Sequence, residues 1–197
     1  MKILNLYAGI GGNRKLWGDE HEVTAVEIDE EIAGIYKGNF PKDKVVVGDA
    51  HEYLLSHYKE FDFIWASPPC PTHSITSYFL NAQGTIRYPD MKLYEEILFL
   101  MAFCKGKFCV ENVKSYYPPM IEPKSIGRHY FWCNFNIEGY SGKIDKIGRF
   151  GKVKSSKTGR TDEKNKLKRN CVEPEIGLHI LNCALNKPII RNQLTLF

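Results

Sequence analysis

Short apolar runs that alternate with helical segments are the feature of this 197-residue sequence that most restricts its fold. The strand-like runs are residues 2–9, 21–29, 43–50, 61–67 and 107–113. Glycine, acidic or proline residues follow most of them. A sixth run, at 128–137, is aromatic. The segments with helical spacing are 30–40, 51–59, 89–104 and 173–185. This alternation predicts an α/β fold, with a mostly parallel sheet that helices cover on both faces.

Two neighbouring segments give more local expectations. Residues 71–89 combine turn-forming and polar residues without a clear period, so we expect a loop there. A long helix is expected to begin near Asp90. Its predicted apolar face consists of Leu93, Ile97, Leu100 and Met101.

The composition is that of a soluble globular protein, because 43% of the residues are hydrophobic and 25% are charged. No window approaches 18 consecutive apolar residues, and the apolar start of the chain is short and interrupted by glycines, unlike a signal peptide. The six cysteines show neither CxxC nor zinc-like His–Cys spacing, so we expect no metal site. We expect reduced cysteines in the cytoplasm, most of them packed in the core.

Positive charge is concentrated in one segment. Residues 142–169 contain eleven Lys/Arg and three acids, a net charge of +8, whereas the whole chain has a net charge of +4. A local excess of this kind indicates a polyanionic partner. A solvated, flexible loop is the alternative interpretation.

Polar or conformationally special residues follow five consecutive predicted strands. They are Gly9, Glu27, Asp49, the Pro68–Cys70 segment and Glu111. In a parallel sheet covered by helices, ligands bind beyond the carboxyl ends of the strands. The sequence therefore predicts one site assembled from these strand ends.

The first three strand ends suggest an adenosyl ligand. The stretch "AGIGG" (8–12) supplies glycines that let the backbone pass close to a ligand, but Arg14 replaces the last glycine of the GxGxxG fingerprint, and a tight turn would explain them equally well. Glu27 is placed to accept hydrogen bonds from both ribose hydroxyls, and Asp49 from an adenine amino group. Either acid alone would be an ordinary solvated side chain, but together with the glycines they favour a bound adenosyl group.

Cys70 follows two prolines at the end of the fourth strand. Taken alone, this cysteine is compatible with a buried apolar residue, a metal ligand or a nucleophile. The prolines restrict the backbone and hold the thiol in one place. Because Glu111 ends the adjacent predicted strand, the placement favours a nucleophile facing an acid.

Several motifs occur in the order and approximate spacing of the DNA cytosine-5 methyltransferases, which this sequence resembles over roughly residues 1–135 and 168–185. The matching stretches are "LYAGIGG", "VEID", "GD", "SPPC", "VENV" and "RNCVEP". The resemblance implies a Rossmann-like, S-adenosylmethionine-dependent methyltransferase fold, with S-adenosylmethionine as cofactor and DNA as partner.

The resemblance also implies roles for individual residues. Cys70 would add to carbon 6 of a flipped cytosine, Glu111 would hydrogen-bond to or protonate ring nitrogen 3, and Arg128 would hold the cytosine carbonyl and the cysteine loop. The implied cofactor-binding residues are Tyr7, Ala8, Gly9, Gly11, Gly12, Glu27, Ile28, Asp49, Ala50, Pro68, Asn170 and Val172. The expected DNA-binding residues are His73, Ser74, Arg149, Lys152, Lys154, Lys157 and Arg160.

The sequence departs from the family pattern in three places. The family usually shows Gln-x-Arg-x-Arg where this chain has the single Arg128, which a surface ion pair would also explain. Pro71 stands where glutamine commonly follows the cysteine. The interval available for target recognition is only about residues 136–168, which predicts short or relaxed sequence specificity, or help from a partner or second copy.

The resemblance predicts four regions, the last of which carries a short binding motif. Residues 1–138 would be the catalytic and cofactor-binding domain, 139–169 a reduced target-recognition region, 170–186 a helix returning to the catalytic domain, and 187–197 a tail. The final "QLTLF" resembles the peptide by which bacterial proteins bind the replicative sliding clamp. Its contacts would be Gln193, Leu194, Leu196 and Phe197, unless the apolar ones pack on the protein's own core. A nucleoid-associated location in a bacterial or phage-infected cell would follow.

Three alternative functions remain open at this point. Amino-group methyltransferases also have a Pro-Pro motif after the fourth strand, but with an aromatic residue in place of Cys70. An RNA substrate is possible because nothing in the sequence identifies a ribose hydroxyl contact. A non-catalytic DNA- or clamp-binding module would be expected to have lost Cys70 or Glu111, and both are present.

Overall fold

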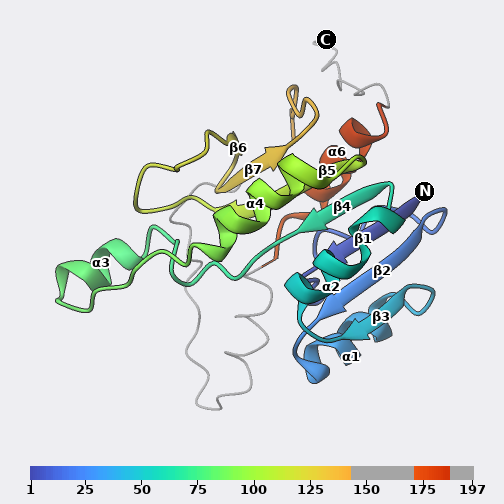
Figure 1. Ribbon diagram of the computed structural model, residues 1–197, viewed down its shortest axis with the longest axis horizontal. Coiled ribbons are helices and arrows are strands. Elements are labelled where there is room, and N and C mark those ends of the chain that lie inside the picture. Colours follow the sequence, from blue (N-terminus) through green and yellow to red (C-terminus); the bar gives the residue numbers. More distant parts are fainter. Residues whose placement is uncertain (143–170, 187–197) are drawn as a thin grey trace, which may run out of the picture.

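A computed structural model describes residues 1–142 and 171–186, which form a seven-stranded sheet flanked by helices (Figure 1). The strands are β1 (Lys2–Leu6), β2 (Glu22–Glu27), β3 (Lys44–Val47), β4 (Phe63–Ala66), β5 (Lys107–Val113), β6 (Lys124–Ile126) and β7 (His129–Cys133). The helices are α1 (Glu30–Asn39), α2 (Ala50–His57), α3 (Ser77–Ala82), α4 (Lys92–Phe103) and α6 (Pro174–Ala184), with a 3₁₀ helix, η1 (Tyr58–Glu60), after α2. None of the helices in the described ranges is long and apolar enough to cross a membrane.

The strand order confirms the expected α/β fold. The order is β3-β2-β1-β4-β5-β7-β6, and the first five strands pair in parallel. Strand β7 is antiparallel to both β5 and β6. Because β1, β2, β4 and β5 run parallel, their carboxyl ends lie at one edge of the sheet, and the turns that follow them open there.

Apolar side chains alternate along the central strands and give each face of the sheet its own core. On one face Ile3 packs in a cluster with Ile180 of α6, and α1 covers the outer strands of the same face. On the other face Leu4 packs in a cluster with Ile97 of α4, beside α2 (Figure 1). Burying one such side chain stabilises the fold by about 1.5–3 kcal/mol. The predicted two-sided covering of the sheet is therefore confirmed.

The connection between β1 and β2 contains no helix and is instead anchored by one tryptophan. The Trp17 ring packs 5.9 Å from that of Trp65, and its indole Nε1–H donates to the Gly177 carbonyl at 3.1 Å. Gly177 lies so close that a Cβ atom there would meet the Asn13 carbonyl oxygen at 2.2 Å. Helix α6 thus packs directly against the turn that follows β1.

The structure differs from the sequence-based description in three local features. Residues 71–89 contain the short helix α3, which has no apolar period because Tyr78 and Phe79 point outward, 64% and 68% exposed. Strand β6 has only three residues and forms as an edge partner of β7.

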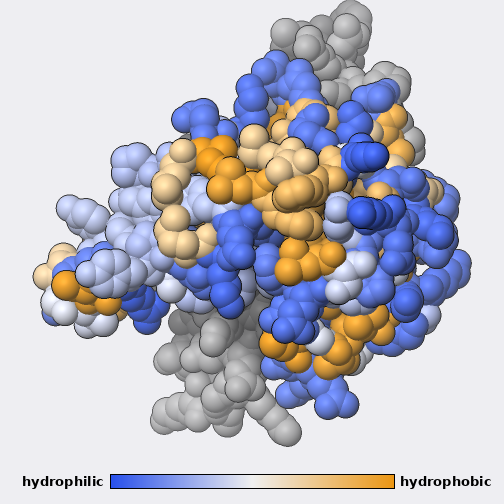
Figure 2. Space-filling view, viewed as in Figure 1, coloured by the Kyte–Doolittle hydropathy of each residue, from blue (hydrophilic) through white to orange (hydrophobic). Residues whose placement is uncertain are grey.

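Met101 is the third difference, since it is exposed and not part of the α4 core. Leu93, Ile97 and Leu100 do face the sheet, as expected. Eight residues of an α-helix turn through about 800°, which places Met101 about 80° away from Leu93 around the helix. Together with Leu98 and Phe103, Met101 contributes to the apolar surface over α4 that Figure 2 shows.

Candidate active site

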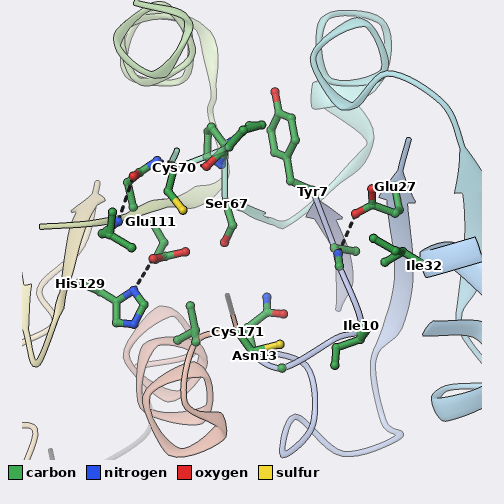
Figure 3. Close-up of a pocket in the computed structure, with 18 of the residues that line it drawn as sticks. Tyr7, Ile10, Asn13, Glu27, Ile32, Ser67, Cys70, Glu111, His129 and Cys171 are labelled. Carbon is green, nitrogen blue, oxygen red and sulfur yellow. Dashed lines mark hydrogen bonds and ion pairs between the residues drawn. The ribbon is translucent and has the colours of Figure 1, made fainter. Parts of the chain in front are cut away.

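A cavity of about 290 Å³ lies beyond the carboxyl ends of β1, β2, β4 and β5 (Figure 3). Its lining residues are Tyr7, Ala8, Gly9, Ile10, Gly12, Asn13, Glu27, Ile32, Ser67, Pro68, Pro69, Cys70, Pro71, Glu111, Asn112, Val113, His129, Cys171 and Val172. Glu27 and Tyr7 lie towards one end of this cavity, and Cys70, Glu111 and His129 towards the other (Figure 3). We refer to these as the cofactor end and the catalytic end. The structure thus brings together four of the five predicted strand ends.

The cofactor end is organised around Glu27. Its Oε2 accepts a hydrogen bond from the Gly9 backbone N–H at 2.9 Å, and its Oε1 accepts from the Ile28 N–H at 3.0 Å. Gly9 has φ +53°, in the left-handed region that glycine adopts readily. Gly12 is packed so tightly that a Cβ atom would lie 2.5 Å from the Cys171 Cβ. A ligand can therefore approach the backbone here, beside a fixed carboxylate with unused lone pairs.

Arg14, the residue that breaks the glycine fingerprint, is part of a buried support behind this turn. Its guanidinium donates to both carboxylate oxygens of Asp43, at 2.9 and 3.0 Å, and both side chains are almost fully buried. The Tyr36 hydroxyl donates to the same Asp43 at 2.9 Å. The guanidinium also lies 5.1 Å from the centre of the Phe40 ring. Arg14 therefore anchors the turn to α1 and the residues after it.

Tyr7 forms the wall between the turn and helices α2 and α4. Its backbone has φ +54°, a strained conformation for a residue with a side chain, and its hydroxyl donates to Glu96 Oε2 at 2.7 Å. Burial raises the pKa of Glu96 to about 7, although Tyr7 and His51 both oppose the shift. His51 Nδ1 lies 3.6 Å from Glu96 Oε2. Tyr7 is thus held against the cavity by a buried acid.

At the catalytic end, Cys70 in the loop after β4 lies beside Glu111 of the adjacent parallel strand β5. Strand β4 ends at Ala66, which pairs with Val110, so the residues after β4 lie beside Glu111 of β5. Figure 3 shows the Cys70 sulfur and the Glu111 carboxylate facing the same space. The Asn112 side chain donates to the Pro68 carbonyl at 3.1 Å. Asn112 thus braces the Pro-Pro-Cys loop against β5.

Cys70 rests as a thiol, because burial raises its pKa. The negative charge of Glu111 raises it further, and the positive charge of Arg128 offsets only part of the effect. A thiolate is the nucleophilic form of cysteine. A nucleophilic role for Cys70 would therefore require loss of the thiol proton.

His129 is the site residue that sequence reasoning missed. Its Nδ1 lies 2.5 Å from Glu111 Oε1, and its Nε2 lies 3.3 Å from Oε2 of Glu173. Glu173 precedes α6 and was also not predicted. Glu173 lies inside the matched stretch "RNCVEP" and His129 follows Arg128, but only the folded arrangement shows that His129 contacts both Glu111 and Glu173.

The remaining predicted residues are distributed unevenly around the cavity. Seven predicted cofactor-binding residues line it, namely Tyr7, Ala8, Gly9, Gly12, Glu27, Pro68 and Val172. Gly11, Ile28, Asp49 and Ala50 do not line it. Asp49 is the N-cap of α2 and accepts from the backbone N–H groups of His51 and Glu52.

Two further predicted residues are used elsewhere in the structure. Arg128 donates from Nη2 to the Cys171 carbonyl at 3.0 Å, and its Nε lies 3.3 Å from Glu173 Oε1, so it pairs with the segment before α6 instead of lining the cavity. His73 is 1% exposed, and its Nδ1 pairs with the Tyr117 hydroxyl at 2.7 Å. We do not retain His73 as a nucleic-acid contact. Ser74 is partly exposed beside it, 2.9 Å from the Thr76 hydroxyl.

Several predicted residues lie outside the described residues. They are Arg149, Lys152, Lys154, Lys157, Arg160, Asn170, Gln193, Leu194, Leu196 and Phe197.

The mostly parallel sheet, with a cavity at the carboxyl ends of its strands, is a Rossmann-like α/β fold, and the family match described next makes it that of an S-adenosylmethionine-dependent methyltransferase. The chain belongs to the C-5 cytosine-specific DNA methylase family, whose model matches residues 1–119. S-adenosylmethionine is accordingly its cofactor. The residues fit this molecule, because the glycine turn leaves room for a ligand beside the Glu27 carboxylate and the apolar Ile10 and Ile32.

Comparisons with individual proteins give one curated relative and several distant structures. A tRNA (cytosine(38)-C(5))-methyltransferase of Spodoptera frugiperda is 33% identical over 86 residues, which are 41% of this chain and 26% of that protein. The chain therefore matches about a quarter of the length of that relative. A SAM-dependent methyltransferase from Agrobacterium tumefaciens is 14% identical with a TM-score of 0.43, covering 59% of this chain and 40% of that one. The Entamoeba histolytica methyltransferase EhMeth is 18% identical with a TM-score of 0.37, covering 57% and 38%.

Proposed function

We propose that this chain methylates carbon 5 of cytosine in DNA, through a covalent bond between Cys70 and a base flipped out of the helix. One observation carries the proposal. Cys70, in the loop after β4, and Glu111, near the end of the adjacent strand β5, face the same cavity whose other end presents Glu27 and the glycine turn. A nucleophile, an acid and a cofactor pocket therefore meet within one cavity.

The proposed chemistry assigns one task to each end of the cavity. Cys70 Sγ bonds to carbon 6 of the cytosine, and Glu111 hydrogen-bonds to or protonates ring nitrogen 3, which makes carbon 5 nucleophilic. When bound, S-adenosylmethionine supplies the methyl group as an electrophile. Solvent water then takes up the carbon-5 proton, the electron pair of that C–H bond re-forms the C5–C6 double bond, and the C6–S bond breaks to release Cys70 as a thiolate. Glu27 holds the cofactor's ribose, and Tyr7 contributes one wall of its pocket.

The raised pKa of Cys70 requires that the substrate complex favours loss of the thiol proton. Arg128 is the cation that lowers this pKa in the structure. Its side chain is held by the Cys171 carbonyl and by Glu173, in the segment before α6. We therefore propose that Arg128 supports the cysteine electrostatically. The sequence-based role, a direct bond to the cytosine carbonyl, would require its side chain to leave Glu173.

Trapping of the covalent bond tests the mechanism. The protein is incubated with labelled S-adenosylmethionine and duplex DNA that contains 5-fluorocytosine, from which the carbon-5 fluorine cannot leave. We expect a stable protein–DNA complex that is absent in Cys70→Ser. Cys171→Ser is the matched control, because Cys171 is the other cysteine that lines the cavity. A complex that persists in Cys70→Ser and disappears in Cys171→Ser would contradict the assignment.

An RNA substrate is a second candidate, because the curated relative is a tRNA methyltransferase. The same labelled cofactor distinguishes the two substrates when duplex DNA and tRNA are offered separately and in competition. We expect methyl transfer to DNA. Transfer to tRNA alone would assign the same Cys70 chemistry to RNA.

The basic segment and the tail are proposed as nucleic-acid and partner contacts. We propose that residues 139–169 contact phosphates, with Arg149, Lys152, Lys154, Lys157 and Arg160 as the basic side chains. We propose that "QLTLF" binds a sliding clamp and raises the local enzyme concentration on DNA. Deleting residues 193–197 should abolish binding to a bacterial clamp in a pull-down and leave turnover on short duplexes unchanged. Unchanged clamp binding would contradict the proposal for the tail.

A further inference from the structure

His129 lies between two carboxylates that come from different parts of the chain. Glu111 of β5 approaches Nδ1 at 2.5 Å, and Glu173 approaches Nε2 at 3.3 Å. The His129 side chain is 3% exposed and that of Glu111 is 7% exposed. Figure 3 shows the imidazole on the side of Glu111 away from Cys70. An imidazole flanked in this way can donate from both nitrogens only when it carries a positive charge.

The surroundings of His129 favour the charged imidazole. Arg128 is the neighbouring cation, and it binds the other oxygen of Glu173, so Glu173 serves two positive groups. The cavity thiols on this side belong to Cys70 and Cys171. Strand β6 places only Ile126 opposite His129. The two carboxylates are thus the anions that face the imidazole from β5 and from the segment before α6.

The ionisation of His129 agrees with this geometry. Burial by itself lowers the pKa of His129, but the charges and hydrogen bonds of Glu111 and Glu173 outweigh it and raise this pKa to about 9. Burial by itself raises the pKa of Glu173, but the contact with His129 and the charge of Arg128 outweigh it and lower this pKa to about 2. At neutral pH the three side chains form a carboxylate–imidazolium–carboxylate row.

We propose that His129 is a positioning residue that supplies Glu111 with the proton it presents to the cytosine, and that Glu173 holds His129 for this transfer. The inference rests on the proposed function of Cys70 and Glu111. The Nδ1–H bond of His129 breaks and an O–H bond forms at Glu111 Oε1, which leaves a neutral imidazole protonated at Nε2, the nitrogen that lies 3.3 Å from Glu173 Oε2. When the bond between Cys70 and the base breaks, the proton returns along the same path. No other reactant is needed.

The arrangement also gives the segment before α6 a role in the reaction. Glu173 lies between Val172, which lines the cavity, and the first residue of α6. Packing of α6 on the sheet therefore sets the distance between Glu173 and His129. A purely structural role for this row would stabilise the fold but would not couple the reaction rate to the charge of His129.

Two measurements on the full-length protein distinguish a proton donor from a structural residue. The first is an NMR titration of the His129 imidazole without substrate. We expect its midpoint near pH 9 in the wild type and about one pH unit lower in Glu173→Gln. Glu138→Gln is the matched control, because Glu138 is exposed and pairs with Lys124 of β6 outside the site. A midpoint near 6.5 in the wild type, or no change in Glu173→Gln, would overturn the inference.

The second measurement is the single-turnover methylation rate of each variant divided by the wild-type rate, from pH 7 to pH 9.5. The ionisation of Cys70 cancels in this ratio. For Glu173→Gln we expect a ratio that falls about sevenfold across this range, because the variant loses the imidazolium charge about one pH unit lower than the wild type does. For His129→Gln we expect a rate at least tenfold below wild type at pH 7. A ratio for Glu173→Gln that does not change with pH would indicate a structural role and overturn the inference.

The outcome is separable from failure of the proposed function. If Cys70→Ser and Glu111→Gln both retain wild-type turnover, the proposed mechanism is wrong. If both lose turnover but the Glu173→Gln ratio stays flat, the mechanism stands and only the role of His129 and Glu173 is wrong.

Discussion

The two ends of the cavity are built in different ways. At the cofactor end the turn after β1 meets Glu27 at the end of the neighbouring strand β2, and the joining contact is a hydrogen bond from a backbone N–H. At the catalytic end Glu111 depends on His129 of β7 and, through it, on Glu173 before α6. The first end is formed by neighbouring elements and backbone geometry, and the second by charged side chains from distant parts of the chain.

This difference predicts that the two ends fail in different ways. The cofactor end is supported by the buried ion pair between Arg14 and Asp43, which lies behind the turn. A change in this pair should therefore lower the stability of the fold. The row of charges at the catalytic end reaches partly exposed Glu173, and a change there should alter the pH dependence more than the stability. Each of the following predictions tests one part of that contrast.

Asp43→Asn should have the largest effect on stability. The variant leaves the buried guanidinium of Arg14 without its carboxylate, and breaking one partner of a buried pair costs about 3–5 kcal/mol of unfolding free energy. Urea unfolding followed by circular dichroism measures this loss. Asp19→Asn is the control, because Asp19 is the exposed second partner of Arg14, 3.8 Å away, and should leave the stability unchanged.

The comparison also predicts that Glu173→Gln destabilises the fold less than Asp43→Asn does. A double variant, Arg14→Met with Asp43→Leu, should recover most of the lost stability, since it removes the unpaired charge. If Asp43→Asn and Glu173→Gln have equal effects, the contrast between the two ends is wrong.

The two ends should titrate in different pH windows. Glu96, behind Tyr7, has a folded-state pKa raised to about 7, so its contribution to stability is complete below about pH 4.5 and is lost as the pH rises through 7. His129 has a folded-state pKa raised to about 9, so its contribution is complete below about pH 6.5 and is lost as the pH rises through 9. Each window corresponds to at most roughly 3 kcal/mol.

Unfolding free energies at pH 5, 7 and 9 measure the two windows separately. Glu96→Gln should flatten the decline between pH 5 and 7 and leave the decline between 7 and 9. His129→Gln should do the reverse. Glu173 titrates far below this range, because its pKa is lowered to about 2. If either variant flattened both windows, the two ends of the cavity would be electrostatically coupled and would not titrate independently.

The sequence predicted that Glu27, Cys70 and Glu111 lie together, because each is at or just beyond the carboxyl end of a strand. Glu27, Cys70 and Glu111 become neighbours as soon as the strands pair in parallel, so the order of the strands is enough to place them. His129 and Glu173 could not be placed in the same way. Their meeting depends on the antiparallel addition of β7 and on the packing of α6, which no local pattern specifies.

Asp49 and Arg128 show a second limit of sequence reasoning, which is competition between two uses of one side chain. An aspartate that precedes a helix can bind a ligand or cap the helix, and Asp49 caps α2. Arg128 can bind a substrate or pair with a carboxylate, and it pairs with Glu173. The short helix α3 was missed for a different reason, since its exposed Tyr78 and Phe79 erase the apolar period by which a helix is predicted.

Gly11→Ala should produce the smallest of these effects and test the cofactor end most directly. Gly11 does not line the cavity, but it has φ +81°, and a Cβ atom there would lie 2.2 Å from Phe40 Cε2 and 2.9 Å from Tyr36 Cε2. Neither ring can move aside easily, because Arg14 lies over Phe40 and Asp43 holds the Tyr36 hydroxyl. The turn itself should therefore shift, and with it Gly9 and Gly12.

We expect Gly11→Ala to weaken S-adenosylmethionine binding about tenfold, the equivalent of about 1.4 kcal/mol, as measured by calorimetry. Gly34→Ala is the matched control, since Gly34 lies within α1 with no atom within 4 Å of an added Cβ, and alanine favours a helix. The His129 titration should be unchanged in both variants, because neither glycine contacts the catalytic end. A Gly11→Ala variant that binds the cofactor normally but shifts the His129 midpoint would reverse the assignment of the two ends.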